Sequence, residues 1–262
     1  MGSTTYAANL QNVGLVAAET RDLLAAYSES GDWRKVRHLA LDQNLLSKRS
    51  TTTVSHILKV VRRRYLKGPE WLPGGQSAGS LFANPSVPER AKVEVAYLYT
   101  VAEDLLVQSC LEGVVFGSLG KVPAGAYLHT DEVLAYLDEL GAQHPELAHW
   151  QPYLKKRWSQ GLLSLLRETG FMETAPSWKL VRPIVLPEAF GFVFPWLAKA
   201  TGSPRAALSH PCLGWWGLER PEARRLLAVG QELGWWRYAA SAAVVEFKPR
   251  YNPGEVLTRD LG

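Results

Sequence analysis

Residues 88–116 have the sequence "PERAKVEVAYLYTVAEDLLVQSCLEGVVF". Apolar residues recur at helical intervals and surround most of the helix circumference, which is typical of a helix buried on nearly all sides. Pro88 stands where such a helix can begin, because proline is tolerated in the first helical turn. The segment therefore predicts the central helix of a bundle and a mainly α fold.

The segments on either side extend this bundle to residues 1–150. "LVAAETRDLLAAY" (15–27) and "WRKVRHLALDQNLL" (33–46) show helical periodicity, and Asp32 can cap the second of them. An amphipathic helix is expected from Thr130, as N-cap, to Gly141. Residues 67–90 are rich in Gly, Pro and Ser, which predicts a long loop.

Residues 151–262 have a different pattern, in which a helix leads into short β structure twice. "LKKRWSQGLLSLLRETGF" (154–171) precedes strand-like "SWKLVRPIVLP" (177–187), and "PEARRLLAVGQELGW" (221–235) precedes "WWRYAASAAVVEFKP" (235–249). Both helices end in Glu-x-Gly-aromatic. This favours a C-terminal winged-helix-like α+β domain with short β-hairpins. The alternative is two unrelated helix ends, since glycine commonly follows a helix.

Charge is unevenly distributed along the 262 residues, although the net charge is only +4. Residues 1–67 contain 11 Lys and Arg against 5 Asp and Glu, residues 68–150 contain 3 against 11, and residues 151–262 contain 15 against 9. Basic surfaces are the usual electrostatic footprint of a polyanionic partner. The two basic ends therefore favour nucleic-acid binding.

The segment "STTTVSHILKVVRRRYLKG" (50–68) carries the densest positive charge. One of Ser50 to Thr53 is expected to cap a helix whose apolar stripe faces the core, with Lys59 and Arg63 opposite the stripe and Arg62 and Arg64 on its flanks. No acid occurs among the cations of residues 48–67, so helical i,i+4 pairing cannot neutralise them. The candidate phosphate-binding residues of this segment are Lys48, Arg49, Lys59, Arg62, Arg63, Arg64 and Lys67.

Two smaller clusters lie at the starts of expected helices, where positive charge opposes the helix dipole. They are Arg34, Lys35 and Arg37, and Lys155, Lys156 and Arg157. The alternative for all these cations is a solvated face, or neutralisation by the acidic residues of 68–150. The ten tryptophans could stack on bases but more often fill a core, which we favour here.

Catalytic and metal-binding patterns are missing from the sequence. There is no HExxH, GxSxG or P-loop, and the two cysteines, Cys110 and Cys212, have no ligand spacing. We expect both cysteines to be unpaired and structural. The apolar stretch 184–198 is interrupted by Pro187, Glu188 and Pro195, so we interpret it as core and not as a membrane span. The expectation is a cytoplasmic, non-enzymatic protein without metal or cofactor.

Several of these stretches together resemble the BrxA family of bacteriophage-exclusion (BREX) defence systems. They are "AANLQNVGLVAAETRDLLAAY" (7–27), "DWRKVRHLALDQNLLSKRSTTTVSHILKVVRRRYL" (32–66), "LYTVAEDLLVQSCLEGVVF" (98–116) and "LLRETGF" (165–171). The resemblance implies an N-terminal bundle similar to the antitermination factor NusB, other BREX proteins as partners, and binding to double-stranded DNA, with RNA as an alternative. The competing hypothesis is a protein–protein scaffold without DNA contact.

Overall fold

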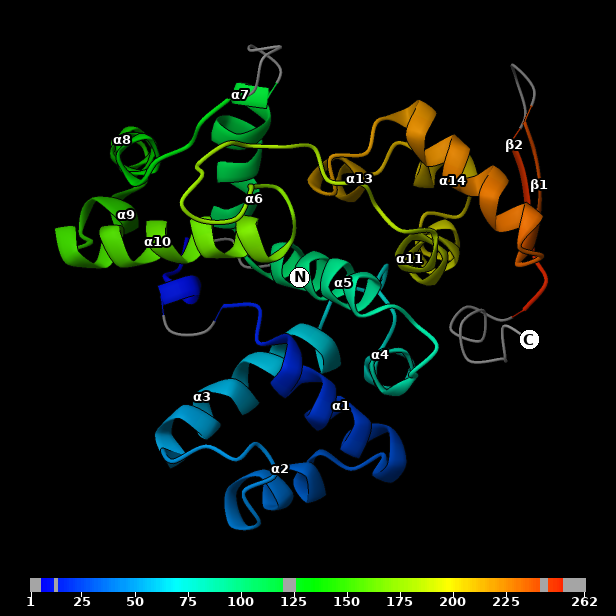
Figure 1. The fold of residues 1–262 in the computed structure, drawn as a ribbon, viewed down its shortest axis with the longest axis horizontal. Coiled ribbons are helices and arrows are strands. Elements are labelled where there is room, and N and C mark those ends of the chain that lie inside the picture. Colours follow the sequence, from blue (N-terminus) through cyan, green and yellow to red (C-terminus); the bar gives the residue numbers. More distant parts are fainter. Residues whose placement is uncertain (1–5, 12–13, 120–125, 241–244, 252–262) are drawn as a thin grey trace. The chain divides into compact units, whose positions relative to one another are not determined.

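The computed structural model describes residues 6–11, 14–119, 126–240 and 245–251 (Figure 1). Within these residues the chain is mainly helical, and its only sheet is one antiparallel pair of strands. The prediction of a mainly α fold is therefore confirmed.

The described chain groups into two compact units, each built from two separate segments. Unit 1 combines Met1–Leu15 with Thr100–Ile184, and unit 2 combines Val16–Tyr99 with Val185–Gly262. These units group helices that pack together across a long stretch of sequence. The division at residue 150 rests instead on a change of sequence pattern along the chain, and it stays a prediction.

Unit 2 begins with helices that pack around α1. Its first segment contains α1 (Ala17–Ser30), α2 (Trp33–Asp42), α3 (Thr51–Val61), a π-helical turn η2 (Arg62–Leu66), α4 (Gly75–Ala83) and the start of α5 (Glu89–Glu103). Helices α2, α3 and α4 all contact α1 (Figure 1). The core of this group is apolar, with Leu23, Leu24 and Val36 fully buried.

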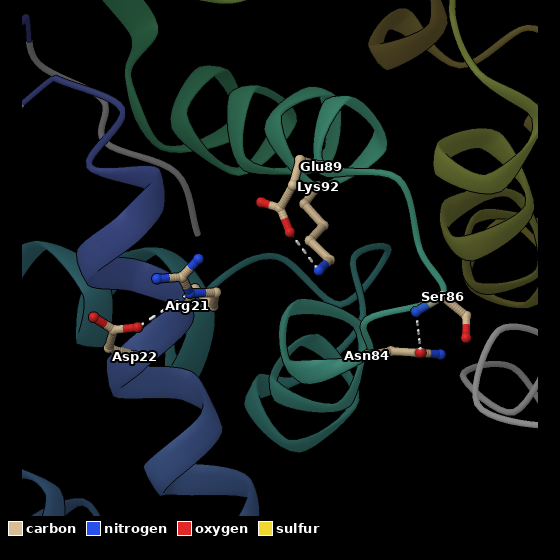
Figure 2. Close-up of polar contacts among 6 residues, drawn as sticks. All are labelled: Arg21, Asp22, Asn84, Ser86, Glu89 and Lys92. Atoms are coloured by element: carbon tan, nitrogen blue, oxygen red, sulfur yellow. Dashed lines mark hydrogen bonds and ion pairs between the residues drawn. The ribbon is translucent and has the colours of Figure 1, made fainter.

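The segment expected to be a long loop, residues 67–90, contains α4, so that prediction was wrong in its middle part. One of the glycines that suggested a loop, Gly79, serves close packing instead. A Cβ on Gly79 would lie 2.4 Å from the backbone oxygen of Leu24, so only glycine lets α4 approach α1 this closely. After α4 the side-chain oxygen of Asn84 accepts a hydrogen bond from the Ser86 N–H at 2.9 Å, in the turn that leads to α5 (Figure 2).

The segment expected to be one long helix, residues 88–116, is divided at Asp104. Helix α5 ends at Glu103, and the Asp104 carboxylate accepts hydrogen bonds from the N–H groups of Leu106 and Val107, at 3.0 and 3.3 Å. This cap starts α6 (Leu105–Cys110), which continues as a π-helical turn η3 (Leu111–Phe116) and α7 (Gly117–Leu119). The expected burial is confirmed, because residues of α5 such as Val95, Ala96 and Leu98 have no exposed surface.

Unit 1 packs α10 (Pro152–Glu168) against α8 (Thr130–Gly141) and the short 3-10 helix η1 (Asn9–Gln11), with α9 (Pro145–Ala148) beside α8 (Figure 1). The predicted apolar face of α10 is buried at Trp158, Leu162, Leu165 and Leu166. The N-cap of α8 is His129 and not Thr130, and the Glu132 carboxylate accepts a hydrogen bond from the His129 N–H. Glu132, three residues after His129, supplies the reciprocal hydrogen bond of a capping box, so the cap lies one position before the predicted Thr130.

The second segment of unit 2 contains α11 (Pro187–Ala200), α12 (Pro204–Ala207), α13 (Pro211–Trp215) and α14 (Arg220–Glu232). The apolar stretch 184–198 forms most of α11, in which Phe190, Val193 and Phe194 are buried. It is therefore a core helix, as expected. No helix among the described residues combines the length and apolarity needed to cross a bilayer.

The two Glu-x-Gly-aromatic sequences end their helices in the same way. Gly170 and Gly234 have left-handed φ values of 80° and 78°. The following aromatic N–H donates back to a helix carbonyl, Phe171 to Leu166 at 2.8 Å and Trp235 to Gly230 at 2.9 Å. This is the hydrogen bond of a Schellman helix end.

Short β structure follows both helix ends, but to different extents. After α14, β1 (Trp236–Ala240) pairs with β2 (Val245–Pro249), while residues 241–244 of the expected strand region lie outside the described part. After α10, the strand expected over 177–187 is reduced to isolated bridges at Lys179 and Leu180. The winged-helix assignment stays a prediction.

Both cysteines are buried and unpaired, as predicted. Cys110 lies in α6 and Cys212 in α13. Burial raises the pKa of each thiol well above its ordinary value. Each therefore behaves as a small apolar side chain of the core.

Candidate nucleic-acid interface

The caps expected for α2 and α3 are present and fix where these basic helices begin. The Asp32 carboxylate accepts a hydrogen bond from the Arg34 N–H at 2.8 Å, and the Ser50 hydroxyl accepts one from the Thr53 N–H at 3.3 Å. Arg34 and Lys35 therefore lie in the first turn of α2, and the exposed residues Thr51 to Thr53 begin α3.

The apolar stripe of α3 lies in the core of unit 2, as the sequence predicted. Its members are Val54, Ile57, Leu58, Val61 and Tyr65, all of which are buried. Because this stripe anchors one side of the helix, the opposite side faces solvent. Lys59, Arg62 and Arg63 are exposed there, as are Arg49 before the helix and Lys67 after it.

Arg64 is an exception and does not belong to this surface. Its side chain is only 2% exposed, and it lies in the π-helical turn that extends α3. The neighbouring Tyr65 ring packs on Phe82 of α4 and Tyr99 of α5, so these helices cover this end of α3. The helical pattern put both Arg62 and Arg64 on flanks of the stripe, and only packing decided that Arg64 is buried. Arg64 is therefore removed from the candidate interface.

Lys48 is already engaged within unit 2. Its ammonium group lies 2.6 Å from the Glu19 carboxylate of α1, and 38% of the lysine side chain remains exposed. Partial burial opposes ionisation of Glu19, but the hydrogen bond and charge of Lys48, with a backbone hydrogen bond, hold the pKa of Glu19 below its ordinary value. Lys48 is consequently a weaker candidate for phosphate contact than its exposed neighbours.

Two other cations of unit 2 are paired locally, in contrast to several of those in and around α3. Lys92 contacts Glu89 at 2.8 Å and Arg21 contacts Asp22 at 3.1 Å (Figure 2). For the exposed cations Arg49, Lys59, Arg62 and Lys67, the described residues provide no ion pair. The positive charge on the exposed face of α3 is thus largely uncompensated within the described structure.

The α2 cluster has the same property. Arg34, Lys35 and Arg37 are exposed, and none forms an ion pair with a described residue, whereas His38 contacts Asp42 at 2.6 Å. An open depression of about 690 Å³ lies between α1 and α2, with Arg34, Lys35 and His38 on one side and Glu29 on the other. Helix α2 also contacts α3, so both basic helices belong to one packed group.

The third predicted cluster, at the start of α10 in unit 1, is partly neutralised. Lys155 lies 2.6 Å from Asp138 of α8, and its side chain is only 14% exposed. An acidic residue of the segment 68–150 therefore neutralises Lys155, as the alternative interpretation of the sequence expected. Lys156 and Arg157 are exposed, and Arg157 donates a hydrogen bond to the Tyr153 hydroxyl at 3.2 Å.

The tryptophan pairs serve mainly the core, as favoured from the sequence. Trp216, Trp235 and Trp236 are buried, and Trp215 is half-buried. The Trp216 N–H donates to the Glu94 carbonyl at 3.0 Å, and the Trp236 N–H donates to the Leu227 carbonyl at 2.7 Å. These rings fix helices in place and are not free to stack on bases.

Among the described residues, no group of three or more His, Cys, Asp or Glu side chains is placed to hold a metal ion. The candidate site is consequently defined by its exposed cations alone, whose members are Arg34, Lys35, Arg37, Arg49, Lys59, Arg62, Arg63 and Lys67. We call this set the α2–α3 basic face.

Sequence reasoning missed one further group of cations, at the C-terminal hairpin. Arg237, Lys248 and Arg250 are exposed there. Their signal was the alternation of basic and aromatic residues in "WRY" (236–238) and "FKPR" (247–250), which predicts that the basic side chains share the outer face.

Comparison with known proteins identifies the family. The model of the BrxA family matches residues 4–193, more than half of the chain. The chain belongs to the BrxA family. Membership makes it a component of BREX phage defence, with other BREX proteins as its expected partners.

One solved structure has a fold similar to that of this chain. A solved structure described as an uncharacterized protein from Magnetospirillum magneticum has a TM-score of 0.60 and 15% sequence identity. The similarity covers 78% of this chain and 96% of that one. At this identity it shows the fold alone. A search of curated proteins found no match.

Proposed function

We propose that this BrxA protein is a non-enzymatic accessory of a BREX system that binds duplex DNA through the α2–α3 basic face, in the cytoplasm. The observation that carries the proposal is the set of exposed cations without an ion-pair partner among the described residues, above all Arg49, Lys59, Arg62 and Lys67. Phosphate oxygens are the natural counter-charge for such a surface, because binding also releases condensed counterions.

The expected binding is independent of base sequence. Arginine and lysine contacts to phosphates position a protein on DNA but do not read its sequence. If four of these cations reach phosphates together, the logarithm of the binding constant should fall against the logarithm of salt concentration with a slope of about −3.6. A-form RNA presents the same phosphates in another geometry, so RNA duplexes are the appropriate comparison.

The test is a fluorescence-anisotropy titration of the full chain with labelled DNA duplexes of two unrelated sequences and an RNA duplex, at several salt concentrations. The double variant Lys59→Glu/Arg62→Glu should lose most of the affinity, and its slope should be shallower by about 1.8. Both side chains are exposed, so the melting temperature should change little. The control Arg21→Glu alters an exposed cation of α1 that already pairs with Asp22, and should bind like the parent.

The scaffold hypothesis gives a different result. In that case the parent protein shows no salt-dependent binding to duplex DNA, and the same double variant instead weakens association with other BREX proteins. Parent-like DNA affinity of the double variant would also show that the α2–α3 basic face is only solvated.

A further inference from the structure

The C-terminal hairpin has an inner face that is fixed in unit 2. The Trp236 ring lies against α14 so closely that a Cβ on Gly230 would be 2.0 Å from it, and its N–H donates to the Leu227 carbonyl. On the partner strand, the Phe247 ring packs edge-on against Phe194 of α11, with centroids 5.2 Å apart. Because side chains alternate along a strand, the residues next to Trp236 in β1 and next to Phe247 in β2 point outward.

The outer face of the hairpin brings two cations directly opposite each other. Arg237 of β1 and Lys248 of β2 are register partners, and both are exposed. Directly opposed residues have Cβ atoms about 5 Å apart, and like charges in this arrangement are destabilising. Arg250 adds a third exposed cation just after β2.

Compensation for this charge is small. Glu246, opposite Ala239, is the only acid in the described strands, and neither Arg237, Lys248 nor Arg250 forms an ion pair with a described residue. The arrangement is unfavourable in isolation. It becomes favourable when an anion bridges the opposed cations.

Helix α14 contributes a further exposed cation on the side of the helix that meets β1. The Gln231 side-chain oxygen accepts a hydrogen bond from the Tyr238 N–H, which places β1 along this side of α14. Arg224 precedes Gln231 by seven residues, or about two turns, so it lies on the same side, and it is exposed. Two acids near the helix start, Glu219 and Glu222, form its capping box, and Glu232 is the remaining acid of α14.

We propose that Arg237, Lys248 and Arg250, with Arg224 of α14, form a second phosphate-binding surface for duplex DNA, here called the hairpin face. The proposal rests on the DNA-binding function proposed above and adds a separate contact area to it. Two exposed cations held directly opposite each other can contact phosphates of the duplex backbone, and such contacts position a protein on DNA without reading its sequence. The hairpin lies beyond residue 193, outside the part of the chain that the BrxA family model matches.

Unit 1 provides an internal comparison, because its helix end is built in the same way. There Lys179, which forms one of the isolated bridges after α10, lies 3.7 Å from Glu173 and is thereby paired. The two helix ends share their backbone hydrogen bonding, but the cation that follows the first one has an acidic partner. Lys179 is therefore the matched control for Lys248.

The experiment measures binding of the full chain to a labelled DNA duplex between 50 and 300 mM salt (roughly the range over which counterion release is readily measured). Arg237→Gln/Lys248→Gln should make the log–log slope shallower by about 1.8, which corresponds to roughly 60-fold weaker binding at about 0.1 M salt. Its melting temperature should stay the same or rise, because the opposed charges are removed. Glu246→Gln should bind more tightly than the parent, and Lys179→Gln should bind like it.

The outcomes separate this inference from the proposed function. Parent-like slope and affinity of both hairpin-face variants, together with lost binding in Lys59→Glu/Arg62→Glu, overturn the hairpin face and leave the α2–α3 basic face standing. Equal weakening by Lys179→Gln and the hairpin double variant shows a nonspecific effect of net charge and also overturns the inference. Absence of salt-dependent binding by the parent overturns both proposals.

Discussion

Arg62 and Arg64, which lie two positions apart, should respond in different ways to replacement by alanine. Arg62 is exposed, whereas Arg64 is 2% exposed. A buried guanidinium must be hydrogen-bonded or paired, and its removal leaves its partners unsatisfied at a cost of about 3 kcal/mol or more. For a chain of this size that corresponds to a fall in melting temperature of roughly 6–12 °C.

Replacement of Arg62 should instead leave stability within about 0.5 kcal/mol of the parent and make the salt slope of DNA binding shallower by about 1. Arg64→Ala should keep the parent slope when measured well below its melting temperature. Arg64→Met retains much of the buried aliphatic stem and should lose less stability than Arg64→Ala.

Thermal unfolding by circular dichroism and the anisotropy titration together check this expectation. An Arg64→Ala protein with parent stability and reduced DNA affinity would refute the reasoning, because it would show that Arg64 is available at the surface. An Arg62→Ala protein that melts several degrees lower would equally refute the assignment of Arg62 to the solvent side.

Three further predictions concern stability and reactivity. Gly79→Ala should destabilise the fold by about 2 kcal/mol or more, because the added Cβ meets the Leu24 carbonyl, whereas Gly74→Ala, with open space around it, should be nearly neutral in denaturant unfolding. The thiols of Cys110 and Cys212 should react with a disulfide reagent only after unfolding, since burial raises the pKa of both; rapid labelling of the native protein would contradict their burial. Burial also raises the pKa of Glu94, so the folded state binds this proton more strongly than the unfolded state does. The free energy of unfolding should therefore fall as pH rises from about 4 through the raised pKa. Glu94→Gln should remove this part of the pH dependence in urea titrations.

The local elements of the α2–α3 basic face could be predicted because their causes are local. Asp32 and Ser50 cap α2 and α3 through hydrogen bonds to residues two or three positions away, and such caps are visible in the sequence. The apolar stripe from Val54 to Tyr65 follows from helical periodicity. Once that stripe is placed in the core, exposure of Lys59 on the other side follows.

Features that depend on a neighbouring helix could not be predicted in the same way. The glycines around α4 indicated a loop, but Gly79 is required because the backbone of α1 lies against it. Asp104 is a different case: its carboxylate caps α6 through local hydrogen bonds, but the apolar periodicity continues through this position and outweighed the signal of the cap. The contact that requires Gly79 is invisible to a pattern of apolar and polar residues.

The sequence by itself determined the helical class, the starts of α2 and α3 and the concentration of positive charge in α2, α3 and the C-terminal segment. Tertiary structure alone decided which cations are available. Arg64 is buried, Lys155 is paired with Asp138 across two helices, and Arg237 is set opposite Lys248 by strand register. The physical reason is that a residue's charge is fixed by its chemistry, whereas its exposure and its partners depend on groups that are distant in the chain and meet only after folding.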